Sequence, residues 1–334
     1  MRVGGFGLLV LGWAAATNAF ASSTATIEGV GFQSMPLQAE NHDLIELARP
    51  QAWARGHGSA GLILGHSQVG LSALTQDGDQ VPLLERATFL SSSGTFAVHE
   101  RVQVSVVAPV YLSVVSGEAP TAAAMGDVQV AVHGVWWSPD VEEGPSFAIG
   151  VRPFVQLPTG DASRYVGHDG VAGGLRLTAS ASMGAFAPTV NTGFRMTPSA
   201  SDEFGIDPDA ALIGAGIAWS GSSLGLSIEM SKDLYLKRTA VMGQGPAEAI
   251  ATARWMSDRQ TQWLAGLGAG LSDGIGAPAF RVFVGSAFGG ASPSEQQPEV
   301  GVARAGVTGP LPVGVPRPVG APQWAHPVES RAQD

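Results

Sequence analysis

Five arginines stand at alternate positions of otherwise apolar segments, and two glutamates and a histidine share the pattern. The set consists of Arg152, Arg176, Arg195, Arg254, Arg281, Glu229, Glu248 and His133. Guanidinium groups that line a narrow aqueous path attract anions, and arginine rings serve as anion filters in pores. The same groups could instead form internal ion pairs, because buried charges need partners. With two or three carboxylates, counting Asp127, positive charge remains in excess, so both interpretations stay open.

The segments that carry these side chains alternate with a period of two, which is typical of β-strands. In GDVQVAVHGVWW (126–137), Val128, Val130 and Val132 share one face, and His133 lies on the other. The polar faces hold mainly Ser, Thr, Gly and a few Arg, whereas a solvent-facing sheet would carry many Lys and Glu. The alternation therefore predicts strands with one face toward lipid and one toward a confined lumen.

Twelve such segments follow one another between residues 58 and 288. We expect strands near 59–75, 85–98, 102–112, 126–137, 146–158, 173–184, 187–197, 209–220, 223–233, 246–256, 260–271 and 278–288. Short and long connections alternate between them, as in transmembrane barrels with short periplasmic turns and longer external loops. The predicted fold class is all-β: a single transmembrane antiparallel β-barrel of about 12 strands.

Aromatic side chains gather beside the predicted short turns: Trp136, Trp137, Phe147, Trp219, Trp255, Trp263 and Phe288. A sparser set lies nearer the long loops: Tyr111, Phe194, Tyr235 and Phe280. Because an indole has an apolar body and a polar N–H, it prefers the headgroup level of a bilayer. Two aromatic rows one strand length apart therefore predict the two membrane interfaces.

Residues 1–21 have the features of a cleaved secretory signal peptide: Arg2, a short apolar run, and small residues before Ser22. We expect residues 22–57 to be an irregular periplasmic lead-in and the Pro/Gly-rich residues 289–334 a disordered periplasmic tail. Charged residues make up only 14% of the chain, and there is no cysteine. The net charge of −10 disfavours nucleic acid as a partner.

The stretches GDVQVAVHGVWW, FAIGVRPFVQLPTGD and GGLRLTASASMG together resemble the β-barrel region of Gram-negative outer-membrane proteins of the OmpA-related, transporter-like kind, which are common in myxobacteria. The resemblance covers approximately residues 58–288 and implies an outer-membrane barrel. Many members of this family continue through acidic calcium-binding repeats into a peptidoglycan-binding domain. Residues 289–334 lack Asp-rich repeats, so the resemblance does not extend to a wall-tethering role.

No catalytic residues, metal ligands or cofactors are expected. His168 lies in a predicted external loop near Asp161, Ser163 and Asp169, but the spacing matches no nucleophile motif, which favours a solvated loop. The acidic loop 199–210 has oxygen ligands that would suit Ca²⁺ but lacks the EF-hand register, so it too is interpreted as a solvated loop.

The expected function is a channel or porin-like passage for small solutes with an Arg-biased lumen, in the bacterial outer membrane. Expected partners are outer-membrane lipid and lipopolysaccharide, the barrel-assembly machinery, and small anionic solutes. The runner-up is a structural or adhesive barrel whose lumen is plugged by the Arg/Glu network. Two further hypotheses are a barrel hydrolase with a Ser–His pair aimed at the outer leaflet and a soluble secreted β-sandwich.

Overall fold

The computed structural model describes residues 25–26, 47–50, 53–74, 80–116, 119–121, 123–138, 146–161, 166–168, 170–197, 209–236, 245–257, 260–272 and 277–289. The predicted signal peptide, most of the predicted lead-in, and the predicted tail after residue 289 lie outside the described residues, as does most of the acidic loop 199–210. Within the described ranges, no helix is long and apolar enough to cross a membrane.

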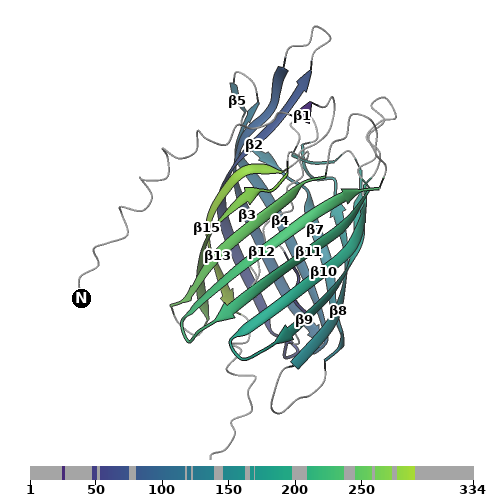
Figure 1. Cartoon of the computed structure of the whole chain (residues 1–334), viewed down its shortest axis with the longest axis vertical. Helices are drawn as coiled ribbons and strands as arrows, with labels where there is room; N and C mark the ends of the chain where they lie inside the picture. The colour runs from purple at the N-terminus through teal and green to yellow at the C-terminus, as the bar shows by residue number, and fades with distance from the viewer. Residues whose placement is uncertain are drawn as a thin grey trace, which may run out of the picture. The chain divides into compact units, whose positions relative to one another are not determined.

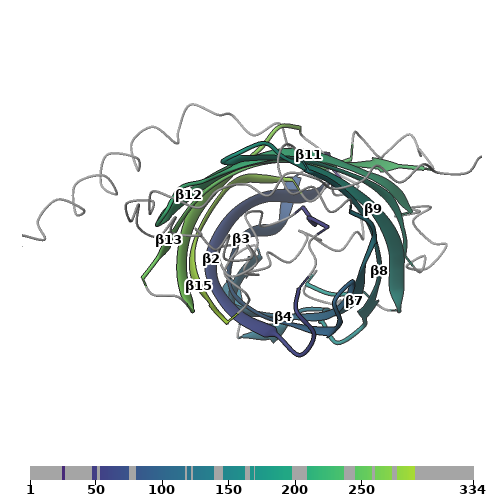
Figure 2. The same cartoon turned by 90° about the horizontal axis from the view of Figure 1, so that it is seen from below.

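Twelve long strands of the described residues form one antiparallel sheet that closes on itself, because each strand pairs with the next and β15 pairs with β2. Figure 2 shows the strands arranged as a ring. They are β2 (Gly58–Leu74), β3 (Gln80–His99), β4 (Val102–Ser116), β7 (Val128–Trp137), β8 (Ser146–Leu157), β9 (Ala172–Ser182), β10 (Phe186–Met196), β11 (Ala210–Ser220), β12 (Leu224–Tyr235), β13 (Ala247–Met256), β14 (Thr261–Gly270) and β15 (Pro278–Gly289). The predicted all-β barrel of twelve strands is confirmed.

Three short strands among the described residues accompany the barrel. β1 (Ala25–Thr26) pairs in parallel with β2, while β5 (Ala119–Thr121) and β6 (Ala124–Met125) pair with β4. β2 and β3 have 17 and 20 residues and project beyond the other strands at the upper end in Figure 1. Sequence alternation alone placed the start of β3 five residues too late, at 85 instead of 80.

The two ends of the barrel differ in the connections they carry. At one end, called the turn end below, lie the connections 100–101, 138–145, 183–185, 221–223 and 257–260. At the other, called the loop end, lie 75–79, 117–127, 158–171, 197–209, 236–246 and 271–277. β2 starts and β15 stops at the turn end, so both ends of the barrel sequence lie there.

The outer face of the barrel is apolar and the inner face is largely polar. In β12, for example, Leu226, Ile228 and Met230 are exposed, whereas Ser227 and Glu229 between them are buried. The same alternation holds in β8, where Val155 and Leu157 are exposed and Arg152 is buried. Since exposed apolar side chains cover the outside of the closed sheet, this surface is suited to hydrocarbon.

The expected aromatic row near the loop end is wrong for Tyr111 and Tyr235. Tyr111 is buried, in phase with the inward-facing Gln103, Ser105 and Val107, and its ring centre lies 6.2 Å from that of Phe89. A bulge follows it, since Thr88 pairs with Ser113 but Phe89 pairs with Tyr111, which leaves Leu112 as the extra residue. Tyr235 is partly buried and packs against the cluster of Ala131, Phe154, Ala210 and Leu212. Phe194 does point outward.

Candidate functional site: the inner wall of the barrel

The eight charged or imidazole side chains singled out in the sequence all lie buried on the inner face. They are Arg152, Arg176, Arg195, Arg254, Arg281, Glu229, Glu248 and His133. Neighbouring positions along each strand point to the opposite face, so the period of two decides the direction of these side chains.

Ion pairs between described residues reach across an intervening strand. Arg281 Nη2 on β15 lies 3.1 Å from Glu248 Oε2 on β13, and β14 runs between them. The inward position of β14 is Gly268, where a Cβ would lie 2.5 Å from Glu248 Oε1. Arg195 Nη2 on β10 lies 2.9 Å from Asp233 Oδ2 on β12, across β11. Part of the charge in the lumen is therefore paired, as the ion-pair interpretation requires.

The arginines on β8 and β9 form a distinct basic area. Arg152 and Arg176 are direct cross-strand partners, and both are buried. Arg152 Nη2 donates to Ser105 Oγ at 3.4 Å, and the guanidinium carbon of Arg176 lies 6.0 Å from the centre of the Phe154 ring. By contrast, the buried carboxylates Glu229, Asp233 and Glu248 lie on β12 and β13. Arg152 and Arg176 thus lie on a different part of the inner wall from Glu229, Asp233 and Glu248, whereas Arg195 and Arg281 each lie beside a carboxylate.

Arg254 lies apart from these groups, near the turn end of β13. Its Nη1 donates a long hydrogen bond of 3.5 Å to Gln262 Oε1 on β14. His133 is the register partner of Gln103, and both side chains are buried. Arg254 and His133 extend the polar lining toward the turn end, on opposite parts of the wall.

Residues 47–50 lie inside the barrel against this wall. The backbone N–H of Leu47 donates to Glu229 Oε2 at 2.9 Å, and that of Ala48 donates to Asn191 Oδ1 at 3.0 Å. Asn191 Nδ2 in turn donates to the carbonyl oxygen of Ala48 at 2.9 Å. Arg49 Nη2 donates to Ser182 Oγ at 3.0 Å. This part of the stretch expected to be a periplasmic lead-in lies in the lumen, since Glu229 and Asn191 are buried inward-facing side chains in mid-strand.

Glycines on the wall make room for this segment. A Cβ at Gly214 would overlap Leu47 Cδ2, and one at Gly216 would lie 3.1 Å from Leu47 Cδ1. The Leu47 side chain packs with Ala187 and Ala218, which are also small. Because these inward positions of β10 and β11 lack bulk, the wall is hollowed where Leu47 lies.

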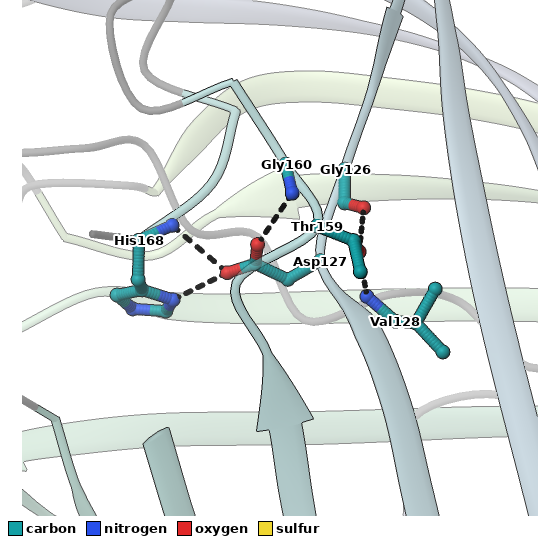
Figure 3. A network of polar contacts seen from close by, with 6 residues as sticks. All are labelled: Gly126, Asp127, Val128, Thr159, Gly160 and His168. Atoms are coloured by element: carbon teal, nitrogen blue, oxygen red, sulfur yellow. Dashed lines mark hydrogen bonds and ion pairs between the residues drawn. The ribbon is translucent and has the colours of Figure 1, made fainter. Parts of the chain in front are cut away.

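A second polar cluster fixes a connection at the loop end (Figure 3). Asp127, just before β7, accepts from the backbone N–H groups of Gly160 and His168, each at 2.9 Å, and His168 Nδ1 lies 2.6 Å from its Oδ2. Thr159 Oγ1 donates to the Gly126 carbonyl and accepts from Val128 N–H, both at 2.9 Å. His168, interpreted from sequence as part of a solvated loop, is therefore tied to Asp127. Ser163 and Asp169, its expected neighbours, lie outside the described residues.

The aromatic side chains near the turn end point outward. Trp136, Trp137, Phe147, Trp255, Trp263 and Phe288 are exposed, and Trp219 is half-buried. Trp255 and Trp263 are cross-strand partners whose stacked rings have their centres 6.5 Å apart. The ring centres of Trp137 and Phe147 are 5.9 Å apart. Phe96 and Phe186 are also exposed near the turn end, although sequence reasoning did not single them out. They follow the same outward phase, which would have identified them.

Sequence reasoning also missed Asn191, Asp233 and the lumenal segment. Asp233 stands inward in β12, in phase with Glu229, and alternation could have found it. Leu47 and Ala48 belong to a stretch without period-two alternation, so no signal marked them. Among the described residues, no three His, Asp or Glu side chains converge in a way that could hold a metal ion.

No protein family and no curated protein matches the chain. Its fold is that of outer-membrane β-barrels. A crystal structure of an outer-membrane channel from Pseudomonas putida F1 is similar over 74% of this chain and 100% of that chain, with a TM-score of 0.53 and 14% identity. The NanC porin covers 69% of this chain and 98% of its own, with a TM-score of 0.47 and 9% identity. Outer membrane phospholipase A from Escherichia coli reaches a TM-score of 0.38 at 9% identity, over 69% of this chain and 92% of its own. The resemblance to the Pseudomonas channel extends to the fold alone.

Proposed function

We propose that the chain spans the bacterial outer membrane and forms a passage for small solutes, with a preference for anions set by the arginines of its inner wall. The apolar outer face and the outward aromatic row near the turn end support a membrane position. Short turns face the periplasm in such barrels, so the turn end is the periplasmic end. Export by the cleaved segment 1–21, insertion by the barrel-assembly machinery, and contact with lipopolysaccharide belong to the same proposal.

The observation that carries the anion preference is the placement of Arg152 and Arg176 side by side on β8 and β9. Two guanidinium groups on neighbouring strands make this part of the lumen attractive to anions, because charges in a narrow low-dielectric space focus their field. The structurally similar Pseudomonas protein is an outer-membrane channel, which agrees with a passage but says nothing of its selectivity.

The test is a reversal-potential measurement on refolded protein in a planar bilayer under a KCl gradient. Wild type should favour chloride, and Arg152→Gln/Arg176→Gln should lose most of this preference. Arg55→Gln/Arg101→Gln is the matched control, since it removes the same net charge at two exposed positions at the turn end. A cation preference in wild type, or an equal loss in both double variants, would contradict the arginine filter.

The second candidate function is a barrel without transport, in which the lumen is closed by its own contents. The lumenal position of residues 47–50 and the two ion pairs favour it. Heat-modifiable gel mobility with no conductance in wild type or in any variant would select this function over the passage.

A further inference from the structure

The contacts of Leu47–Pro50 amount to a binding site for a peptide backbone. One side-chain amide, that of Asn191, both accepts from the N–H and donates to the carbonyl of Ala48, as a neighbouring strand would. The carboxylate of Glu229, which is fully buried, accepts from the adjacent N–H, that of Leu47. Hydrogen bonds to a charged acceptor are among the stronger ones in proteins.

Shape complements these hydrogen bonds. Leu47 fills the hollow over Gly214 and Gly216, and a Cβ at Gly150 would lie 2.9 Å from Pro50 Cβ. Three inward glycines on β8 and β11 thus stand where the segment passes. Buried glycines weaken strands, so their presence at the points of closest approach indicates a wall shaped around this segment.

The segment is tethered at the turn end. Trp53 is buried, and its backbone N–H donates to the carbonyl oxygen of Glu100 at 3.2 Å. Gly56 has a φ of 84° and donates to the Ala97 carbonyl at 2.9 Å, just before β2 begins at Gly58. From this anchor Leu47 reaches the middle of the lumen, because Asn191 and Glu229 stand halfway along β10 and β12.

We infer that residues 47–50 are a docked strap that narrows the passage and leaves the wall when the channel opens; this rests on the function proposed above. Barrels of eight strands are filled by their own side chains, whereas barrels of 16 to 18 strands leave a channel. The twelve-stranded barrel lies between these sizes, and residues 47–50 occupy part of its interior. The ring of twelve strands closes through pairing between the strands, without the strap, so release of the strap leaves this pairing intact.

The test uses one variant on each side of the contact, in the full chain. Asn191→Ala removes the wall's two hydrogen bonds to Ala48, and Leu47→Ala removes the apolar anchor without altering the wall. Losing two buried hydrogen bonds should shift the ratio of docked to released strap about tenfold. Both variants should therefore raise the open fraction in single-channel recordings, Asn191→Ala through the lost hydrogen bonds and Leu47→Ala through the lost apolar packing. Thr189→Ala is the matched control, because it truncates a buried inward side chain of the same strand whose Oγ1 makes no hydrogen bond among the described residues.

Because the chain has no cysteine, a disulfide can lock the strap. Leu47 Cγ lies 3.7 Å from the Cβ position of residue 214, so Leu47→Cys/Gly214→Cys brings two sulfurs within bonding reach. The oxidised protein should stay at the lowest conductance level, and reduction should restore openings. In single Leu47→Cys protein, Asn191→Ala should speed labelling by a soluble maleimide about tenfold.

Faster labelling without a change in conductance would overturn the inference, because the strap would then leave the wall without opening a path. Equal labelling rates in both backgrounds would also overturn it. Silence of every variant, including the reduced disulfide protein, would instead refute the channel function, while the labelling rates would still report whether the segment is docked.

Discussion

Arg152 and Arg176 face each other across the β8–β9 pair, both buried on the inner face of the barrel. Like charges directly opposite on neighbouring strands repel each other, so such a pair is costly unless the surroundings compensate. Ser105 and the Phe154 ring contact these two guanidinium groups, while the ion-paired Glu248 and Asp233 lie on β13 and β12. The basic area therefore lies on other strands than the carboxylates of the two ion pairs described above.

The first prediction reverses one charge of this area. Arg176→Glu should shift the reversal potential toward potassium further than Arg176→Gln does, because it replaces attraction for anions with repulsion. The shift should shrink at high ionic strength as salt screens the field. Bilayer recordings at low and high KCl measure both effects. An equal shift from Arg101→Glu, an exposed position at the turn end, would mean that net charge and not the lumen sets the preference.

The second prediction concerns the pair Arg281–Glu248 across β14. Arg281→Met should destabilise the barrel by about 3–5 kcal/mol, since it removes the cation that lies 3.1 Å from a buried carboxylate. Adding Glu248→Leu should recover much of this loss. Urea unfolding in lipid vesicles, followed by tryptophan fluorescence, gives the four free energies of a double-mutant cycle. Additive losses would show that the 3.1 Å contact contributes little.

The features that the sequence predicts correctly are those set by residues adjacent to one another in the chain. Alternation between neighbours placed Arg152 and Glu229 on the inner face and Trp255 on the outer face, because a strand side chain points opposite to the next. The pairing of each strand with the next strand in the chain followed from the short connections between them. These features need no knowledge of the closed barrel.

Partners across the barrel were not predictable. That Arg281 meets Glu248 depends on the stagger of β13 to β15 and on the absence of a side chain at Gly268. The lumenal position of Leu47 depends on glycines far later in the chain, at 214 and 216, and the segment has no periodicity of its own. Tyr111 lies near a long loop, but the phase of β4 turns its side chain to the inner face.

The third prediction tests the apolar outer face at two depths. Val190 is exposed at the middle of β10, so Val190→Arg should cost about 2–4 kcal/mol in a lipid bilayer. Trp136→Arg near the turn end should cost about 0–1 kcal/mol for the burial of charge, because that position lies at the headgroup level. Unfolding in vesicles measures both, with Val190→Leu as the control for side-chain size. Equal costs at the two positions would argue against a membrane-spanning orientation.

The fourth prediction concerns the cluster around Asp127, whose carboxylate holds the connection between β8 and β9 at Gly160 and His168 (Figure 3). Asp127→Ala removes the acceptor of two backbone N–H groups and the partner of the His168 ring. Hydrogen bonds to a charged group contribute about 1.5–3 kcal/mol each, so the loss of the two from backbone N–H groups should lower the free energy of local opening of this connection by roughly 3–6 kcal/mol.

Hydrogen exchange at the amides of Gly160 and His168 measures this loss directly, and it should exceed any change at Val130 in the barrel wall. Asp127→Asn should be intermediate, because one oxygen remains to accept from Gly160 or His168 while the charge is gone. Val171→Ala, which truncates an exposed side chain in the same connection, should leave both amides as protected as in wild type.

A substitution of Gly160 in this connection should also reduce the protection of these amides against hydrogen exchange. The Cβ that Gly160→Ala adds would lie 2.6 Å from the Gly167 Cα and 2.8 Å from Asp127 Oδ1, so this variant should reproduce the faster exchange without removing the carboxylate. Unchanged exchange in Asp127→Ala would mean that Thr159 and the close approach of Gly160 to Gly167 hold the connection by themselves.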